Sequence, residues 1–206
     1  AIGAYRSHWR SVAADGVQCR QCRHYNAAMR QVLRLHPSSL SAAGTAVEAE
    51  VSRRQTTFSL CYTVIGNDLL VPPLAAPART DELWRHTCFE AFVRATSNAG
   101  YYEFNFAPST QWAAYRFSGY RAGVSVAGLM RAPDLKVQST SGQFELQAMV
   151  ELDGLPDLPP DASWKIGVSA VVENISGHLS YWALVHPAGE AYFHHPDCFS
   201  IQLPTA

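Results

Sequence analysis

Apolar and polar side chains alternate with a period of two through residues 87–117, and this pattern leaves few choices of fold. Successive side chains of a β-strand point to opposite faces of a sheet, so the alternation predicts strands rather than helices. We expect strands over residues 87–95, 101–106 and 111–117. The turn sequence Ser97-Asn98-Ala99-Gly100 should join the first two strands as a hairpin.

The same alternation sorts the hairpin side chains into two faces. One face is apolar and is expected to meet the core: Phe89, Ala91, Val93, Tyr102, Phe104 and Phe106. Glu90, Glu103 and Asn105 then gather on the opposite face as cross-strand neighbours. Two acids and an amide are not needed to fill a core. We therefore predict that this second face is a binding surface.

Further short strands are expected on both sides of the hairpin. They cover residues 33–37, 46–51, 56–65, 136–140, 143–151, 164–172, 179–186 and 198–203. Turn signals separate these segments, no convincing amphipathic helix is visible, and residues 120–133 read as a long loop. The pattern predicts an all-β fold, an antiparallel β-sandwich with a single domain.

Residues 1–31 differ from the rest of the chain, because they contain five arginines and lack strand alternation. We interpret them as an N-terminal extension and residues 32–206 as the sandwich domain. Cys19 and Cys22 form a Cys-x-x-Cys pair that His24 follows. Since a second pair of ligands is missing, we interpret the cysteines as free thiols rather than as a metal or redox site.

The charge balance of the chain argues against two classes of partner. A formal net charge of −1 and a pI near 6.8 leave no electrostatic footprint for nucleic acid or an anionic membrane. No apolar run approaches the ~20 residues that span a bilayer. The five cysteines are an odd number at scattered positions, which favours a reducing cytoplasm over a disulfide framework, although a removed leader stays open. Oligomeric state is open as well.

Two runs of residues resemble the bacterial DOMON-like domains, which are themselves similar to family-nine carbohydrate-binding modules. Residues 83–92 read LWRHTCFEAF, and residues 102–121 read YEFNFAPSTQWAAYRFSGYR. A later block with the same resemblance holds SYWAL at 180–184, His186-Pro187 and Phe193-His194. The resemblance extends over residues 33–203. It implies a ligand-binding β-sandwich, with sugars as ligands in some branches and heme in others.

Sugar binding needs a flat ring against the C–H face of a pyranose, together with planar polar groups for its hydroxyls. The predicted ligand site consists of Glu90, Glu103, Asn105, Gln111, Trp112, Tyr115, Arg121 and Trp182. We expect Trp112 or Trp182 to stack on the sugar while the acids, Asn105 and Arg121 fix its hydroxyls. The sequence thus predicts a non-catalytic domain that binds a carbohydrate or a sugar-containing metabolite, without cofactor or metal. A purely structural role, with the rings in the core and the acids paired to Arg94, Arg116 or Arg121, stays open.

Catalysis is one alternative that the residues allow. Glu90 and Glu103 could be the acid and the base or nucleophile of a glycoside hydrolase, which needs carboxyl groups roughly 5 to 9 Å apart. Cross-strand neighbours lie close enough to meet this condition, with Cβ atoms ~5 Å apart. Any hairpin with two facing acids would also meet it.

Heme and metal binding are further alternatives. A heme module would need axial ligands, for which Met130 or Met149 with His178 or His186 are candidates. The run His194-His195-Pro196-Asp197-Cys198 offers imidazole and thiolate groups that suit a transition metal. We interpret this run as a polar loop before the last strand.

Overall fold

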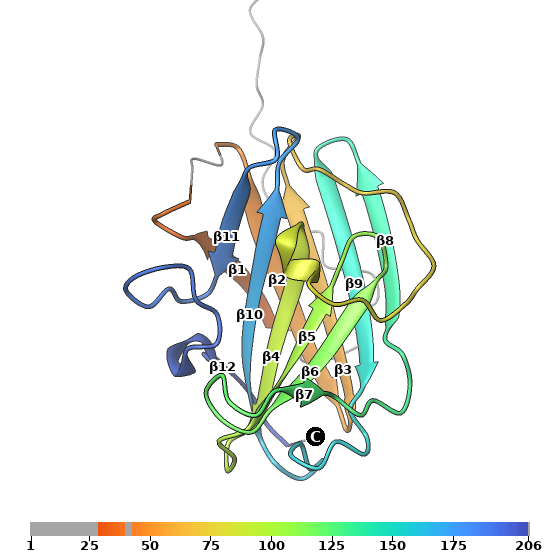
Figure 1. Cartoon of the computed structure of the whole chain (residues 1–206), viewed down its shortest axis with the longest axis vertical. Coiled ribbons are helices and arrows are strands. Elements are labelled where there is room, and N and C mark those ends of the chain that lie inside the picture. The colour runs from red at the N-terminus through yellow and green to blue at the C-terminus, as the bar shows by residue number, and fades with distance from the viewer. Residues whose placement is uncertain (1–28, 40–42, 206) are drawn as a thin grey trace, which may run out of the picture.

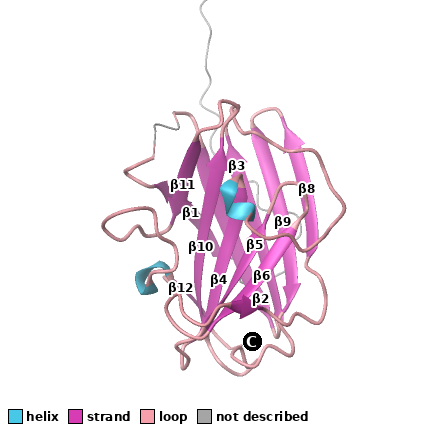
Figure 2. Cartoon of the chain, viewed as in Figure 1, coloured by secondary structure: helices cyan, strands magenta, loops and turns pink. Residues whose placement is uncertain are grey.

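The computed structural model describes residues 29–39 and 43–205, and it confirms the predicted all-β, antiparallel β-sandwich with a single domain. Among these residues, the short 3-10 helices η2 (Leu83–Arg85) and η3 (Pro196–Cys198) lie in the loops between strands. Figures 1 and 2 show the strands, which are β1 (Met29–Leu35), β2 (Ala46–Arg54), β3 (Thr57–Ile65), β4 (Cys88–Ala95), β5 (Tyr101–Phe106), β6 (Trp112–Phe117), β7 (Ser125–Val126), β8 (Asp134–Thr140), β9 (Gln143–Glu151), β10 (Trp164–Glu173), β11 (Leu179–Ala183) and β12 (Ile201–Leu203).

The strands form two layers that share β1 (Figure 1). The first layer has the order β2, β3, β9, β8, and the second has the order β7, β6, β5, β4, β10, β11, with β12 paired to β10. β1 belongs to both layers, because residues 29–33 pair with β2 while Arg34 and Leu35 pair with β11. The sandwich is therefore one continuous sheet that curls back on itself.

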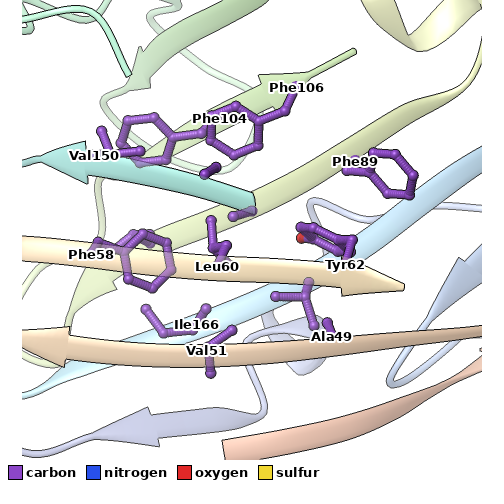
Figure 3. Packing of buried hydrophobic residues seen from close by; sticks show 14 of the residues in the cluster. Ala49, Val51, Phe58, Leu60, Tyr62, Phe89, Phe104, Phe106, Val150 and Ile166 are labelled. Carbon is purple, nitrogen blue, oxygen red and sulfur yellow. The ribbon is translucent and has the colours of Figure 1, made fainter. Parts of the chain in front are cut away.

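Apolar side chains fill the space between the two layers (Figure 3). Tyr62 of β3 lies against Phe89 of β4, with ring centroids 5.0 Å apart, and Phe89 stacks on Phe144 of β9 at 5.9 Å. Each large side chain that is buried in this way stabilises the fold by about 1.5–3 kcal/mol. All six residues of the predicted apolar hairpin face are buried in this core, so that part of the prediction is confirmed.

Some boundaries differ from those expected. β1 begins at Met29, so the predicted boundary between extension and domain at residue 32 falls inside a strand. The last strand begins at Ile201 rather than at residue 198, because Pro196 starts the η3 turn. The predicted long loop at 120–133 contains the two-residue strand β7. Cys19, Cys22 and His24 lie outside the described residues.

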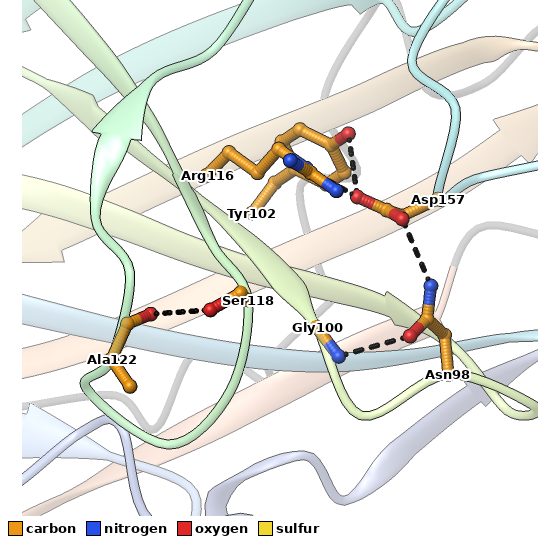
Figure 4. Close-up of polar contacts among 7 residues, drawn as sticks. All are labelled: Asn98, Gly100, Tyr102, Arg116, Ser118, Ala122 and Asp157. Atoms are coloured by element: carbon orange, nitrogen blue, oxygen red, sulfur yellow. Dashed lines mark hydrogen bonds and ion pairs between the residues drawn. The ribbon is translucent and has the colours of Figure 1, made fainter.

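A polar cluster fastens the loop between β9 and β10 to the second layer (Figure 4). The Asp157 carboxylate accepts hydrogen bonds from Arg116 Nε at 2.5 Å, Asn98 Nδ2 at 3.0 Å and the Tyr102 hydroxyl at 3.1 Å. Asn98 also closes its own turn, since its Oδ1 accepts from the Gly100 amide at 3.1 Å. The hydrogen bond from Arg116 is the main reason that the pKa of Asp157 is lowered.

We expect Asp157→Asn to lower the free energy of unfolding by less than about 1 kcal/mol, because the ion pair with Arg116 is lost and water already screens it. The folded pKa of Asp157 lies below its unfolded pKa of about 4, so its stabilising effect is present above that pH. The wild type should lose the effect as pH falls through the folded pKa, and the variant should show no such loss. Urea unfolding at a series of pH values measures both quantities.

Asp153→Asn is the control, because it removes an exposed acid from the same loop. Equal unfolding free energies for the two variants at neutral pH would mean that the Asp157 cluster does not hold the loop in place.

Candidate functional site

The strand register brings the predicted acids and amide together. Glu90 of β4 pairs with Asn105 of β5, and Glu103 of β5 pairs with Phe92 of β4. Ser169 of β10 pairs with Glu90 from the other side. All of these polar side chains lie on the face of the second layer that is turned away from the core, where the alternation placed the hairpin acids. We call the set formed by Glu90, Glu103, Asn105 and Ser169 the polar strip.

The polar strip is deeply buried, since Glu90, Glu103 and Asn105 are 4%, 7% and 1% exposed. The Ser169 hydroxyl donates to Glu90 Oε2 at 2.9 Å, and Asn105 Nδ2 donates to Glu103 Oε1 at 2.7 Å. Asn105 Oδ1 is also buried and has no hydrogen-bond partner among the residues that the structure describes. The strip therefore holds a buried acceptor to which none of the described residues donates.

Burial changes the protonation of the two acids. Loss of water is the main cause and repulsion by the Glu103 carboxyl the second, and together they raise the pKa of Glu90 to about 8. Burial also raises the pKa of Glu103, although the Asn105 hydrogen bond and the charge of Arg121 oppose the rise. At neutral pH the pair therefore retains a proton.

Two segments that are far apart in sequence cover the ends of this face (Figure 1). At one end η2 places Leu83 in a cluster with Cys88, Ala107 and Ala113. At the other end lie rings from the segment after β11 and from the strands beneath it: Phe193, Phe199, Phe92, Tyr101 and Phe117. Along β4 the order is Cys88, Glu90, Phe92, so the polar strip lies between the two covers.

Gly167 of β10 lets the second cover approach the sheet closely. A Cβ atom at this position would lie 2.9 Å from the Cys198 carbonyl oxygen and 3.6 Å from Phe92 Cβ. A larger residue would push η3 away from the strand. The main chain of this cover thus packs directly on the sheet.

His194 meets the polar strip from the side of this second cover. The Tyr101 hydroxyl accepts a hydrogen bond from the backbone amide of Arg121 at 3.3 Å, so its own proton can point to His194 Nδ1 at 2.8 Å. The neutral imidazole then carries its proton on Nε2, which lies 3.7 Å from Glu103 Oε2. Burial, together with the charge of Arg121, lowers the pKa of His194 to about 4. His194 is therefore a neutral group beside Glu103.

The remaining polar residues of the predicted site have different surroundings. Tyr115 is the cross-strand neighbour of Glu103 and donates to Asp81 Oδ1 at 2.5 Å. The Arg121 guanidinium donates to the Tyr192 hydroxyl and lies over that ring. Tyr115 and Arg121 thus border the strip. Gln111 instead donates to Thr80 Oγ1 at 2.9 Å, which ties it to the loop before η2.

The two tryptophans that were expected to stack on a ligand lie on the core side of the sheet. Trp112 pairs with the core residue Phe106 and packs against the core. Trp182 is buried in the core, and its Nε1 donates to Ser180 Oγ at 2.9 Å. Their place in the strand alternation turns both rings inward. The prediction that either ring lies beside the acids is wrong.

The arginines considered as partners of the acids are also engaged elsewhere. The Arg94 guanidinium lies over the Phe199 ring at 4.8 Å, and Arg116 binds Asp157. Arg121 acts on Glu103 through its charge, but its hydrogen bond goes to Tyr192. The acids of the polar strip are therefore not neutralised by these arginines through direct ion pairs.

Trp84 lies on η2 and has an exposed ring, whose direction the strand alternation could not predict. Trp84 is 49% exposed, and the Arg85 guanidinium lies 5.5 Å from its ring centroid. The next residue, His86, contacts Glu173 Oε2 at 2.8 Å. A period-two pattern gives no direction for a residue in a turn, although Trp84 stands in the motif that precedes β4. Trp84 offers a flat ring on the cover at one end of the polar strip.

A separate cavity of about 200 Å³ opens elsewhere, between the ends of the two layers. Val64 of β3 and Val172 of β10 line it together with Asp68, Asn174 and His178. Val172 belongs to the core, so this cavity lies on the opposite face of β10 from Ser169. It is distinct from the polar strip.

Residues 194–198 form a turn in which the side chains already contact their neighbours. His195 Nδ1 accepts from the Asp197 amide at 3.2 Å, and Cys198 Sγ donates to the Tyr192 carbonyl at 3.4 Å. Within residues 29–39 and 43–205, no group of three or more His, Cys, Asp or Glu side chains could hold a metal ion. The same part of the chain contains no helix that is long and apolar enough to cross a membrane.

We expect His194 to remain neutral, with its proton on Nε2, until the pH falls to about 4. Nitrogen-15 NMR of the imidazole distinguishes the two tautomers and measures the titration. Tyr101→Phe removes the donor to Nδ1 and should give a mixture of tautomers. Tyr181→Phe, which changes a second ring packed against the same cluster, is the control. A single Nε2-protonated form in Tyr101→Phe would show that Tyr101 does not fix the tautomer.

The chain matches no protein-family model and no curated protein sequence. Two solved structures resemble it in fold. A proposed carbohydrate-binding protein from Bacteroides uniformis matches with a TM-score of 0.58 and 13% identity, over 83% of this chain and 84% of that one. A family-nine carbohydrate-binding module from Caldicellulosiruptor kristjanssonii, in complex with glucose, matches with a TM-score of 0.52 and 11% identity, over 88% and 85%. The chain thus has the β-sandwich fold of these two proteins.

Proposed function

We propose that this domain binds a carbohydrate at the polar strip and does not act on it chemically. The likeness of its fold to two proteins described as carbohydrate-binding supports the ligand class. The resemblance of its motifs to DOMON-like domains, whose ligands are sugars in some branches and heme in others, is compatible with this class. A fold can carry many functions, so the proposal rests on the site.

The observation that carries the proposal is Asn105 Oδ1, which lies beside two buried acids and has no hydrogen-bond donor within residues 29–39 and 43–205. A buried acceptor without a donor costs about 1–3 kcal/mol, which a ligand hydroxyl can recover by donating to it. Sugars present several hydroxyl donors at fixed spacing, and planar carboxyl and amide groups bind them well. The polar strip offers both kinds of group on adjacent strands.

We assign the stacking role to Trp84 in place of Trp112 and Trp182. Its ring is exposed and lies on the cover at one end of the strip, whereas the other two rings pack in the core. Tyr120, which is 53% exposed, and Tyr192 lie beyond the other end, next to Arg121. Aromatic rings at both ends of the polar strip can contact the C–H face of a pyranose, while the strip binds its hydroxyls.

We expect Trp84→Ala and Glu103→Gln each to weaken sugar binding about tenfold or more, since ~1.4 kcal/mol of lost contact gives that factor. A glycan array identifies the sugar, and calorimetry on the wild type and variants measures the affinity. Asp153→Asn is the control for a remote change of charge, and thermal unfolding checks that each variant is folded. Unchanged affinity in both variants would remove these residues from the site.

The same protein samples test the two alternative functions, glycoside hydrolysis and heme binding. Turnover of aryl glycosides that depends on Glu90 and Glu103 would identify a hydrolase. A Soret band after incubation with heme would identify a heme module.

A further inference from the structure

We propose that the polar strip selects an amine-bearing sugar over the matching neutral or acidic sugar, with the ammonium group bound by Glu90, Glu103 and Asn105. This inference rests on the proposed function and specifies its ligand. It comes from the balance of charge and of hydrogen-bond donors on the strip.

The charge balance of the strip is negative. Two carboxyl groups lie on adjacent strands with little exposure to water. The basic groups nearby have other partners, as Arg121 binds Tyr192, Arg94 lies over Phe199 and Arg116 binds Asp157. His194 is neutral, because Tyr101 donates to its Nδ1 and burial lowers its pKa. Among the described residues, neither acid forms an ion pair with arginine or lysine.

The numbers of hydrogen-bond donors and acceptors on the strip also favour an ammonium group. The donors on the strip are the Ser169 hydroxyl, the Asn105 amide nitrogen and the one proton that the acid pair retains, and the first two already bind an acid. The acceptors outnumber these donors: in the described part of the chain Asn105 Oδ1 has no donor, and the His194 Nε2 atom lies 3.7 Å from Glu103 Oε2. An ammonium group supplies three N–H donors and a positive charge. A hydroxyl supplies one donor, and a carboxylate adds repulsion.

Burial increases the difference in binding free energy between an ammonium group and a hydroxyl. Opposite charges attract more strongly where water is excluded, and an unpaired buried charge is costly. Burial raises the pKa of both acids, so the strip keeps a proton at neutral pH. The bound ammonium would take the place of that proton, which Glu90 would release to solvent. Ammonium binding thus restores two carboxylates that are each paired.

A hard cation such as Ca²⁺ is the competing occupant, because carboxylate and amide oxygens are its usual ligands. Ca²⁺ takes about six to eight oxygen ligands. The strip offers two acids, one amide and one hydroxyl, and the amide nitrogen is turned toward Glu103. The donor set therefore favours an ammonium group over Ca²⁺.

Calorimetry at about pH 6.5, where a primary amine keeps its proton, tests the inference with four probes. They are glucose, glucosamine, N-acetylglucosamine and glucuronate. We expect glucosamine to bind at least tenfold tighter than glucose, N-acetylglucosamine to lose this gain, and glucuronate to bind more weakly than glucose. Glucosamine binding in buffers of different ionisation enthalpy should also reveal proton release that glucose binding lacks.

The variants show whether the polar strip is the source of the preference. In Glu90→Gln and Glu103→Gln the ratio of glucosamine to glucose affinity should fall toward one, whereas Asp153→Asn should keep the wild-type ratio. The ratio is the readout because it does not depend on a general loss of sugar affinity. Thermal unfolding confirms that the variants are folded.

The outcomes separate this inference from the proposed function. Equal affinity for glucose and glucosamine in the wild type overturns the inference and leaves carbohydrate binding intact. An array and calorimetry that detect no sugar at all overturn both. Glu103-dependent binding of Ca²⁺ alone, which glucosamine does not displace, assigns the strip to a metal ion and overturns the inference.

Discussion

The burial of β4 and β5 on both of their faces is the constraint on which the rest of this structure depends. Every residue of β5 is buried, and so is every residue of β4 except Arg94. The inner side of these strands meets the core, and the outer side needs a cover of its own. The η2 turn and the segment around η3 supply that cover. The polar strip is buried because it lies between these covers.

The strip is held from three directions, which makes it a rigid site. From the core side, the Tyr62 hydroxyl of the first layer donates to the Glu90 carbonyl oxygen at 2.5 Å. From the neighbouring strand, Ser169 orients the Glu90 carboxyl. From the outer cover, the Arg121 amide orients Tyr101, which in turn orients His194 beside Glu103. A site that is held by packing and hydrogen bonds before a ligand arrives loses little entropy when the ligand binds.

The strand alternation was sufficient for the sheet and for the direction of the acids, because both depend on local periodicity. The bounds of β5 and β9 match those expected, and Glu90, Glu103 and Asn105 share the outer face. The second cover could not be predicted, since it comes from residues after β11 that have no local link to the hairpin.

The predicted positions of the tryptophan rings were wrong for two further reasons. Trp112 and Trp182 were chosen by residue type, yet their place in the alternation turns them into the core. Trp84 lies in a 3-10 turn, where a period of two gives no orientation. Rings in strands can thus be placed from sequence only when residue type and alternation are read together.

Because β1 pairs with strands of both layers, the sheet has fewer edges at which another chain could pair. Two separate sheets would present four terminal strands, whereas the continuous path through the described strands ends at β7 and β8, with the three-residue β12 as a further edge beside β10. β7 is two residues long, and the exposed positions of β8 include Asp134, Lys136 and Gln138. A short terminal strand and a charged one are poor templates for the addition of a foreign strand. The shared strand therefore reduces the number of sheet edges at which a foreign strand could pair, as well as joining the two layers.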